Sequence, residues 1–170
     1  MNAGDDRTKW LRIYVSDHLA GAAAGSSRAR RLADAERDGP DAAALQQLAD
    51  EIAADRRALQ VLADSLNLRP QRSKQLVAAI AERVGLVKLN GRIFRRSPLT
   101  TLVEVEAMVI AVRGKLAGWE TLRGVPEAAA VNVVDIEDLV TRTTQQYDTL
   151  QQIHRRTAER LLGRPGPITP

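Results

Sequence analysis

The sequence predicts an all-α protein built as a bundle of four long helices. Hydrophobic residues make up 44% of the 170 residues but aromatic residues only 3%, so the core has to be built from Ala, Leu, Val and Ile. Ala and Leu are strong helix formers, and small side chains let helices approach closely. Four long segments carry apolar residues at helical spacing, and Gly and Pro punctuate the chain between them. We therefore expect one domain, residues 1–162.

The first two helices are expected over residues 5–36 and 41–66, on either side of a Gly-Pro turn. Asp5 or Asp6 can cap the first helix, and Asp41 can cap the second. The second helix has the most regular apolar spacing in the chain. Its apolar seam consists of Leu45, Leu48, Ile52, Asp55, Leu59, Leu62 and Leu66. The alternation of three and four residues is that of a bundle seam, so a carboxylate, Asp55, is predicted among leucines.

A long crossover, residues 67–97, follows the second helix. A short amphipathic helix is expected over 73–84, ended by Gly85. The stretch 86–96 has no helical period, and an extended connector is favoured there over a hairpin, because two lone strands are marginal in water. The crossover holds eight basic residues against one acidic residue. The excess positive charge of the chain is therefore concentrated in this segment.

The third and fourth helices are expected over residues 98–122 and 133–162. Ser97-Pro98 is a favourable helix start, and the Gly- and Pro-rich tail, 163–170, is predicted to be disordered. Short turns force neighbouring helices to be antiparallel, whereas a long crossover lets the third helix run parallel to the second. The predicted topology is up, down, down, up.

Charged and polar residues fall on the predicted inner faces of these helices. On the third helix the apolar face is interpreted as Leu102, Val105, Val109, Ile110, Leu116 and Ala117. This face has Glu106 and Arg113 near its centre. The predicted inward polar set is His18, Asp55, Glu106, Arg113, Tyr147 and His154. A buried ion-pair network around Arg113 that fixes the helix register is the favoured interpretation, since a guanidinium suits two carboxylates at once. A metal site or a small-ligand site is the alternative.

Glycines also recur one turn apart on two helices. Gly21 and Gly25 lie on the first helix, and Gly114 and Gly118 lie on the third. Glycine inside a helix costs up to about 1 kcal/mol relative to alanine, so four of them suggest close backbone approach. We expect the first and third helices to cross there. An interior cavity and a dimer contact are the alternatives.

The four helices and the long crossover resemble the ferritin-like superfamily. Members that bind two irons carry a Glu on each of two helices and Glu-x-x-His on each of the other two. Here residues 151–154 read Gln-Gln-Ile-His, with Gln in place of the motif Glu, and the second helix has no His. The chain is therefore similar to bacterial members of that superfamily that lack the complete di-iron motif, and no cofactor is expected. Any metal would have to use His18, Glu51, Asp55, Glu106 and His154.

Composition narrows the function further. The absence of cysteine excludes thiolate chemistry and disulfides, and no catalytic residue is assigned. Residues 1–9 lack an apolar signal core, and the longest small-apolar run, Leu19 to Gly25, is too short to cross a bilayer. We expect a cytoplasmic protein without membrane contact.

The leading hypothesis is a non-enzymatic interaction or assembly protein that forms a homo-oligomer. The first alternative is a metal-binding or small-ligand-binding bundle that uses the inward polar residues. The second alternative is binding of a polyanion such as nucleic acid through the crossover. The candidate anion-binding residues are Arg69, Arg72, Lys74, Lys88, Arg92, Arg95 and Arg96.

Overall fold

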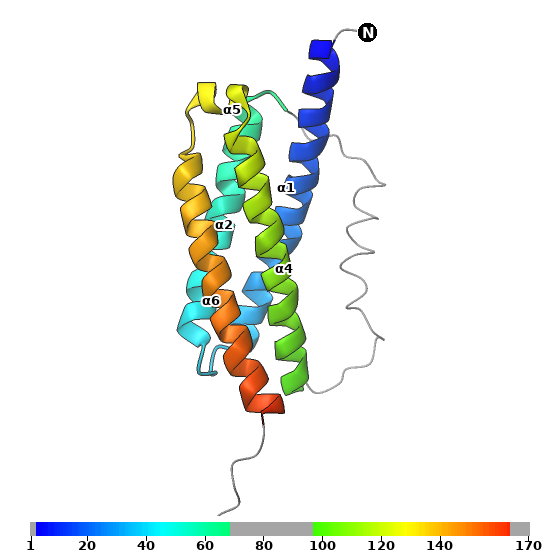
Figure 1. Cartoon of the computed structure of the whole chain (residues 1–170). Coiled ribbons are helices and arrows are strands. Elements are labelled where there is room, and N and C mark those ends of the chain that lie inside the picture. Colours follow the sequence, from blue (N-terminus) through cyan, green and yellow to red (C-terminus); the bar gives the residue numbers. More distant parts are fainter. Residues whose placement is uncertain (1–2, 69–96, 164–170) are drawn as a thin grey trace, which may run out of the picture.

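The computed structural model describes residues 3–68 and 97–163, and every regular element in these residues is a helix (Figure 1). The helices are α1 (Ala3–Ala35), α2 (Ala42–Ser65), α4 (Pro98–Arg123), α5 (Pro126–Val131) and α6 (Ile136–Leu162). The all-α prediction is confirmed, and the four long helices lie close to their expected bounds. The predicted crossover helix 73–84, the stretch 86–96 and residues 164–170 of the tail lie outside the described residues.

Several helix starts and caps differ from the prediction. α1 begins at Ala3, ahead of Asp5 and Asp6. Asp41 precedes α2 but makes no capping hydrogen bond; its carboxylate instead accepts from Arg156 of α6 at 2.6 Å. The short helix α5 was not predicted, because six residues are too few to show a helical period. α6 is capped by Asp135, whose side chain accepts from the backbone N–H of Asp138 at 3.0 Å.

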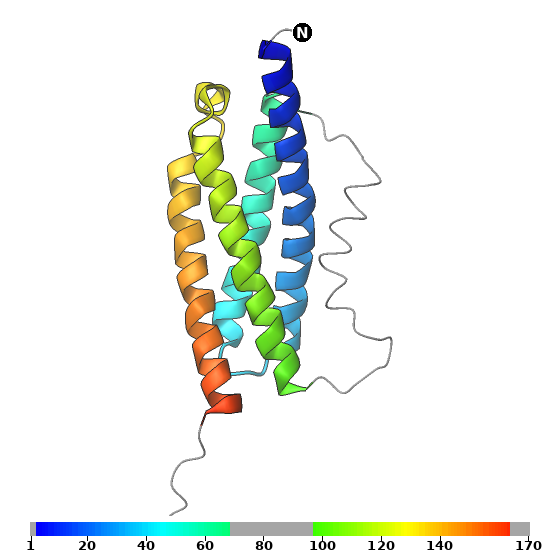
Figure 2. The ribbon, with the colours of Figure 1, turned by 45° about the vertical axis from the view of Figure 1, so that its right-hand side comes forward.

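The four long helices run along one another, with α2 and α4 pointing in the same direction (Figures 1 and 2). At one end of the bundle, Thr101 near the start of α4 donates to Glu36, which follows α1, at 2.7 Å. At the other end, Arg7 of α1 donates to Glu127 of α5 at 2.8 Å. α4 is therefore antiparallel to α1. The Arg156–Asp41 contact likewise places the end of α6 beside the start of α2.

The bundle consists of two closely packed helix pairs. α1 packs along α2, and α4 packs along α6; the two pairs meet mainly through α1 against α4, while α2 and α6 approach each other less closely. Two apolar clusters fill the interior. One contains Ala29, Leu32, Ala33, Leu45, Leu48, Ala49, Ile52, Val105, Met108, Val112, Leu150 and Ile153. The other contains Val15, Leu19, Leu59, Leu62, Ala63, Leu68, Trp119, Leu122, Ala128, Ile136 and Leu139.

The buried face of α4 is not the predicted one. The face that packs inward consists of Leu102, Val105, Met108, Val112, Leu116, Trp119 and Leu122. Ile110 is 73% exposed, and Glu106 and Arg113 are also exposed. The prediction of a buried Arg113 is therefore wrong. α4 carries apolar residues on nearly all sides, so their spacing alone does not select a face.

None of the helices in the described ranges is long and apolar enough to span a membrane.

Candidate functional site

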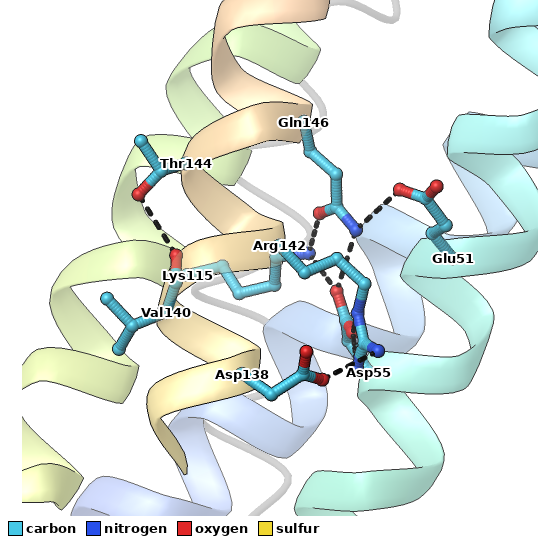
Figure 3. A network of polar contacts seen from close by, with 8 residues as sticks. All are labelled: Glu51, Asp55, Lys115, Asp138, Val140, Arg142, Thr144 and Gln146. Atoms are coloured by element: carbon cyan, nitrogen blue, oxygen red, sulfur yellow. Dashed lines mark hydrogen bonds and ion pairs between the residues drawn. The ribbon is translucent and has the colours of Figure 1, made fainter. Parts of the chain in front are cut away.

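A cluster of charged and amide side chains lies between the two apolar clusters of the bundle, and Figure 3 shows its polar contacts. Its centre is Asp55, whose side chain is only 1% exposed. One carboxylate oxygen of Asp55 accepts from Lys115 Nζ at 2.5 Å. The other accepts from Arg142, through Nε at 2.9 Å and Nη2 at 2.8 Å. The buried carboxylate is thus held by two cations from two different helices.

An amide and two further carboxylates complete this cluster. Gln146 Nε2 donates to Asp55 and to Glu51, each at 3.1 Å, and Gln146 Oε1 accepts from Lys115 at 2.5 Å. Arg142 also pairs with Asp138 at 3.1 Å. Positions four apart share one face of a helix, which is why α2 presents Glu51 with Asp55. The same spacing aligns Asp138, Arg142 and Gln146 on α6 (Figure 3).

Burial acts on the charge of Lys115. Loss of hydration lowers the pKa of the Lys115 ammonium below its ordinary value of 10.5, and attraction to Asp55 opposes this effect. The ammonium has three N–H donors. Two of them serve Asp55 and Gln146, and the third has no acceptor among the described residues. Within the part of the chain that the structure describes, Lys115 therefore keeps one donor for a further group.

A cavity of about 300 Å³ lies beside Lys115, between α1, α2 and α4. Its wall is mostly apolar and includes Ile52, Leu59, Met108, Val112, Trp119 and Leu122. Asp55 and Lys115 also line it, so it touches the charged cluster directly. This volume is at the lower end of the range of small-molecule sites, which are also mostly apolar with a few polar groups.

The glycine pairs line this cavity, and the prediction of a tight crossing is wrong for three of the four. A Cβ atom built at Gly21, Gly25 or Gly114 would meet no atom within 4 Å. Gly118 is different, because a Cβ there would lie 2.6 Å from Cδ2 of the His18 ring. Because Gly21, Gly25 and Gly114 have no side chains, space is left between α1 and α4, which agrees with the alternative prediction of an interior cavity. Of the four glycines, only Gly118 allows close approach of another residue, the ring of His18.

The residues of the predicted inward polar set are not brought together. Asp55 lies in the interior as predicted. Glu106 and His154 form a pair at the surface, with Nε2 3.1 Å from Oε1. His18 is half-buried, and its Nδ1 lies 3.0 Å from the carbonyl oxygen of Tyr14. Tyr147 is half-buried and accepts from Gln151 at 2.7 Å. The cation that holds Asp55 is Lys115 together with Arg142, not Arg113.

Sequence reasoning missed Lys115, Arg142 and Gln146. The buried residues of α6 are Ile136, Leu139, Thr143, Gln146, Leu150, Ile153 and Thr157. A signal was present, because Gln146 lies between Leu139 and Leu150 at the same helical spacing. Lys115 and Arg142 gave no comparable signal, since long side chains reach inward from the edge of a buried face.

The residues proposed for a metal are spread over three places. Glu51 and Asp55 are engaged with Gln146, whereas His18 lies over Gly118, and Glu106 and His154 lie at the surface. No group of three His, Asp or Glu side chains in the described ranges is arranged to hold a metal ion. The candidate anion-binding residues, 69–96, lie outside the described residues, so the polyanion hypothesis stays a prediction.

Comparison of the chain with family models, with curated proteins and with solved structures gave no match.

Proposed function

We propose that this protein is a non-enzymatic helical bundle. In the cavity between α1, α2 and α4 it binds a small molecule that has a hydrocarbon body and a carboxylate at one end. The observation that carries the proposal is the contact between an apolar cavity of about 300 Å³ and a half-buried lysine, Lys115, whose third donor has no acceptor among the described residues. An apolar wall favours a hydrocarbon body, and the ammonium of Lys115 favours an acceptor oxygen at one end of the ligand.

The order and direction of the helices support a ferritin-like arrangement for this bundle. Two antiparallel pairs, α1 with α2 and α4 with α6, pack face to face, and α2 runs parallel to α4. These are the features expected where a long connection joins the second and third long helices. The interior cluster is built from facing side chains of α2, α4 and α6, and facing side chains of a bundle can build a ligand site.

The charges around Asp55 favour an organic ligand over a metal ion. Lys115 and Arg142 both lie within 3 Å of the Asp55 carboxylate. A cation bound to that carboxylate would face two positive charges at close range in a poorly hydrated interior, which is unfavourable. A ligand carboxylate beside Lys115 would instead gain a charge-assisted hydrogen bond.

Tryptophan fluorescence offers a direct test. Trp119 lines the cavity, whereas Trp10, the other tryptophan, is 62% exposed on α1. In a Trp10→Phe variant, Trp119 is the single reporter. Titration with decanoate below its micelle concentration is expected to change the Trp119 emission saturably. Decyltrimethylammonium, which has a chain of similar length and the opposite charge, is expected to bind roughly ten- to hundredfold more weakly, because a hydrogen bond to a charged group contributes roughly 1.5–3 kcal/mol.

Two variants in the Trp10→Phe background localise the binding. Gly25→Leu places a side chain in the open space at Gly25 and is expected to abolish the decanoate response, whereas Ala43→Leu, exposed on α2, is the matched control and is expected to preserve it. Lys115→Met is expected to remove the preference for the carboxylate. Circular dichroism checks that each variant is folded. Equal binding of decanoate to the Gly25→Leu and Ala43→Leu variants would contradict the proposed site.

A further inference from the structure

The outer face of α4 carries an apolar stripe that no described residue covers. Leu99 is 56% exposed and Ile110 is 73% exposed, and Val103 between them is also exposed. At about 100° per residue these three side chains lie within roughly 20° of one line along the helix. Ala117 and Thr121, both exposed, continue the same line. From Leu99 to Thr121 the stripe is about 33 Å long at 1.5 Å per residue.

Two opposite charges border this stripe on the same side. Glu106 precedes Ile110 by four residues and Arg113 follows it by three, so the two lie at nearly equal distances from Ile110 along the helix. Both lie roughly 40–60° to one side of the stripe. The other side carries only the small residues Ala107 and Gly114. Glu106 contacts His154 at the surface, and Arg113 makes no ion pair within the part of the chain that the structure describes.

We propose that a second copy of this chain packs on this stripe, antiparallel to the first and related to it by a two-fold axis near Ile110. A two-fold interface brings each residue of the patch against its symmetric counterpart. In this arrangement Ile110 meets the partner's Ile110, and Val103 meets the partner's Ala117. The small residues at 114 and 117 let the two α4 helices approach closely.

The charge pattern is what identifies a second copy as the occupant. An antiparallel pair of helices brings equal flanks together, so Glu106 faces the partner's Arg113, and Arg113 faces the partner's Glu106. The symmetric placement of opposite charges about Ile110 therefore makes the stripe complementary to itself. A parallel two-fold pairing would place the charged flank against the partner's flank of Ala107 and Gly114, so neither Glu106 nor Arg113 would meet an opposite charge.

The apolar part of the proposal is tested by the concentration dependence of the molecular mass. Sedimentation equilibrium of the full chain, up to about millimolar concentration, is expected to show a monomer–dimer equilibrium. Ile110→Asp is expected to leave only the monomer, because it places two carboxylates at the two-fold axis. Val61→Asp is the matched control, since Val61 is a 47% exposed residue on α2, away from the stripe, and it is expected to preserve the dimer.

A charge exchange tests the orientation and the register. Glu106→Arg and Arg113→Glu, each alone, put like charges opposite each other twice per dimer, and each is expected to weaken the dimer about tenfold. The double variant, Glu106→Arg with Arg113→Glu, restores opposite charges and is expected to dimerise within about threefold of the natural chain. This recovery would not follow if the two charges only solubilised the surface.

Three results would overturn the proposal. The first is a natural chain that is monomeric at every concentration. The second is a double variant that dimerises no better than the single variants. The third is an Ile110→Asp variant that alters protease cleavage within residues 69–96 without changing the molecular mass, which would assign the stripe to the chain's own segment.

Discussion

Asp55 shows how a single buried charge organises the middle of this bundle. Its carboxylate is almost inaccessible to solvent, and it is bonded by Lys115, Arg142 and Gln146. Burying a carboxylate is costly unless good ion pairs and hydrogen bonds compensate it. Here both oxygens are occupied, so the cluster satisfies the charge while it interrupts the apolar seam of α2.

Replacing Asp55 with Asn tests this balance. The Asp55→Asn variant leaves Lys115 and Arg142 near each other without their shared carboxylate, and it is expected to lower the free energy of unfolding by about 3–5 kcal/mol. Urea denaturation at neutral pH measures the difference. Asp50→Asn is the control on the same helix, because Asp50 forms an exposed pair with Arg30, and it is expected to change stability little. Equal effects of the two substitutions would contradict the central role of Asp55.

The lowered pKa of Lys115 predicts a pH dependence of stability. Because the folded-state pKa is lower than the unfolded one, the unfolded chain binds more protons between the two values, and stability rises with pH in that window. The window lies below the ordinary lysine pKa of 10.5. Arginine does not titrate there. The natural chain is therefore expected to gain stability relative to Lys115→Arg as pH rises through this window toward 10.5, measured by urea unfolding. A constant difference across this range would be inconsistent with the lowered pKa.

The sequence allowed Asp55 to be predicted but not its cations. Asp55 occupies one position of a regular leucine seam, so its burial follows from helical spacing alone. Arg113 and Lys115 are two residues apart and therefore point about 160° apart on the helix. Choosing between them required the orientation of α4, which its apolar residues on nearly all sides do not determine.

At the scale of the element, the glycines of α1 and α4 separate into two kinds. Alanine stabilises a helix interior by about 0.5–1 kcal/mol relative to glycine where the added methyl has space. Gly25→Ala and Gly114→Ala are expected to show this gain, because a Cβ at either position meets nothing within 4 Å. Gly118→Ala is expected to show no gain, because its Cβ would strike the ring of His18.

Thermal unfolding measures these three substitutions, and His18→Ala provides the control. In the His18→Ala background the ring is absent, so Gly118→Ala is expected to recover the gain seen at the other two glycines. A similar gain at all three glycines in the natural background would show that His18 moves aside freely.

Helix positions could be predicted better than helix contacts. Proline and glycine mark where α2 and α4 begin and end, so their predicted bounds lie within one residue of those observed. α5 was not predicted because its six residues are too few to show the helical period of apolar residues. The empty space at Gly21, Gly25 and Gly114 could not be separated from a tight crossing, since small residues are compatible with both.

At the scale of the whole molecule, the order of the helices can be tested by cross-linking. The chain has no cysteine, so introduced pairs are unique. Cysteines at Glu36 and Thr101, whose side chains are in contact at one end of the bundle, are expected to cross-link within one chain with a short bismaleimide. Cysteines at Arg7 and Thr101, at opposite ends, are not. Gel mobility after proteolysis distinguishes the products, and cross-linking of the second pair would require α4 to run the other way.

The spacing of polar residues on α6 bears on how that helix is kept from sliding. Displacing α6 by one turn, about 5.4 Å, moves a neighbour into the place of Arg142. A shift in one direction puts Asp138 in that place, so that its carboxylate faces the carboxylate of Asp55 in a poorly hydrated interior. In the other it is Gln146, and Leu150 replaces the amide that now bridges Glu51 and Asp55. Apolar faces alone would tolerate such a shift of α6 along its axis. The ion pairs and hydrogen bonds around Asp55 therefore select one alignment of α6 against α2 from several that would otherwise compete.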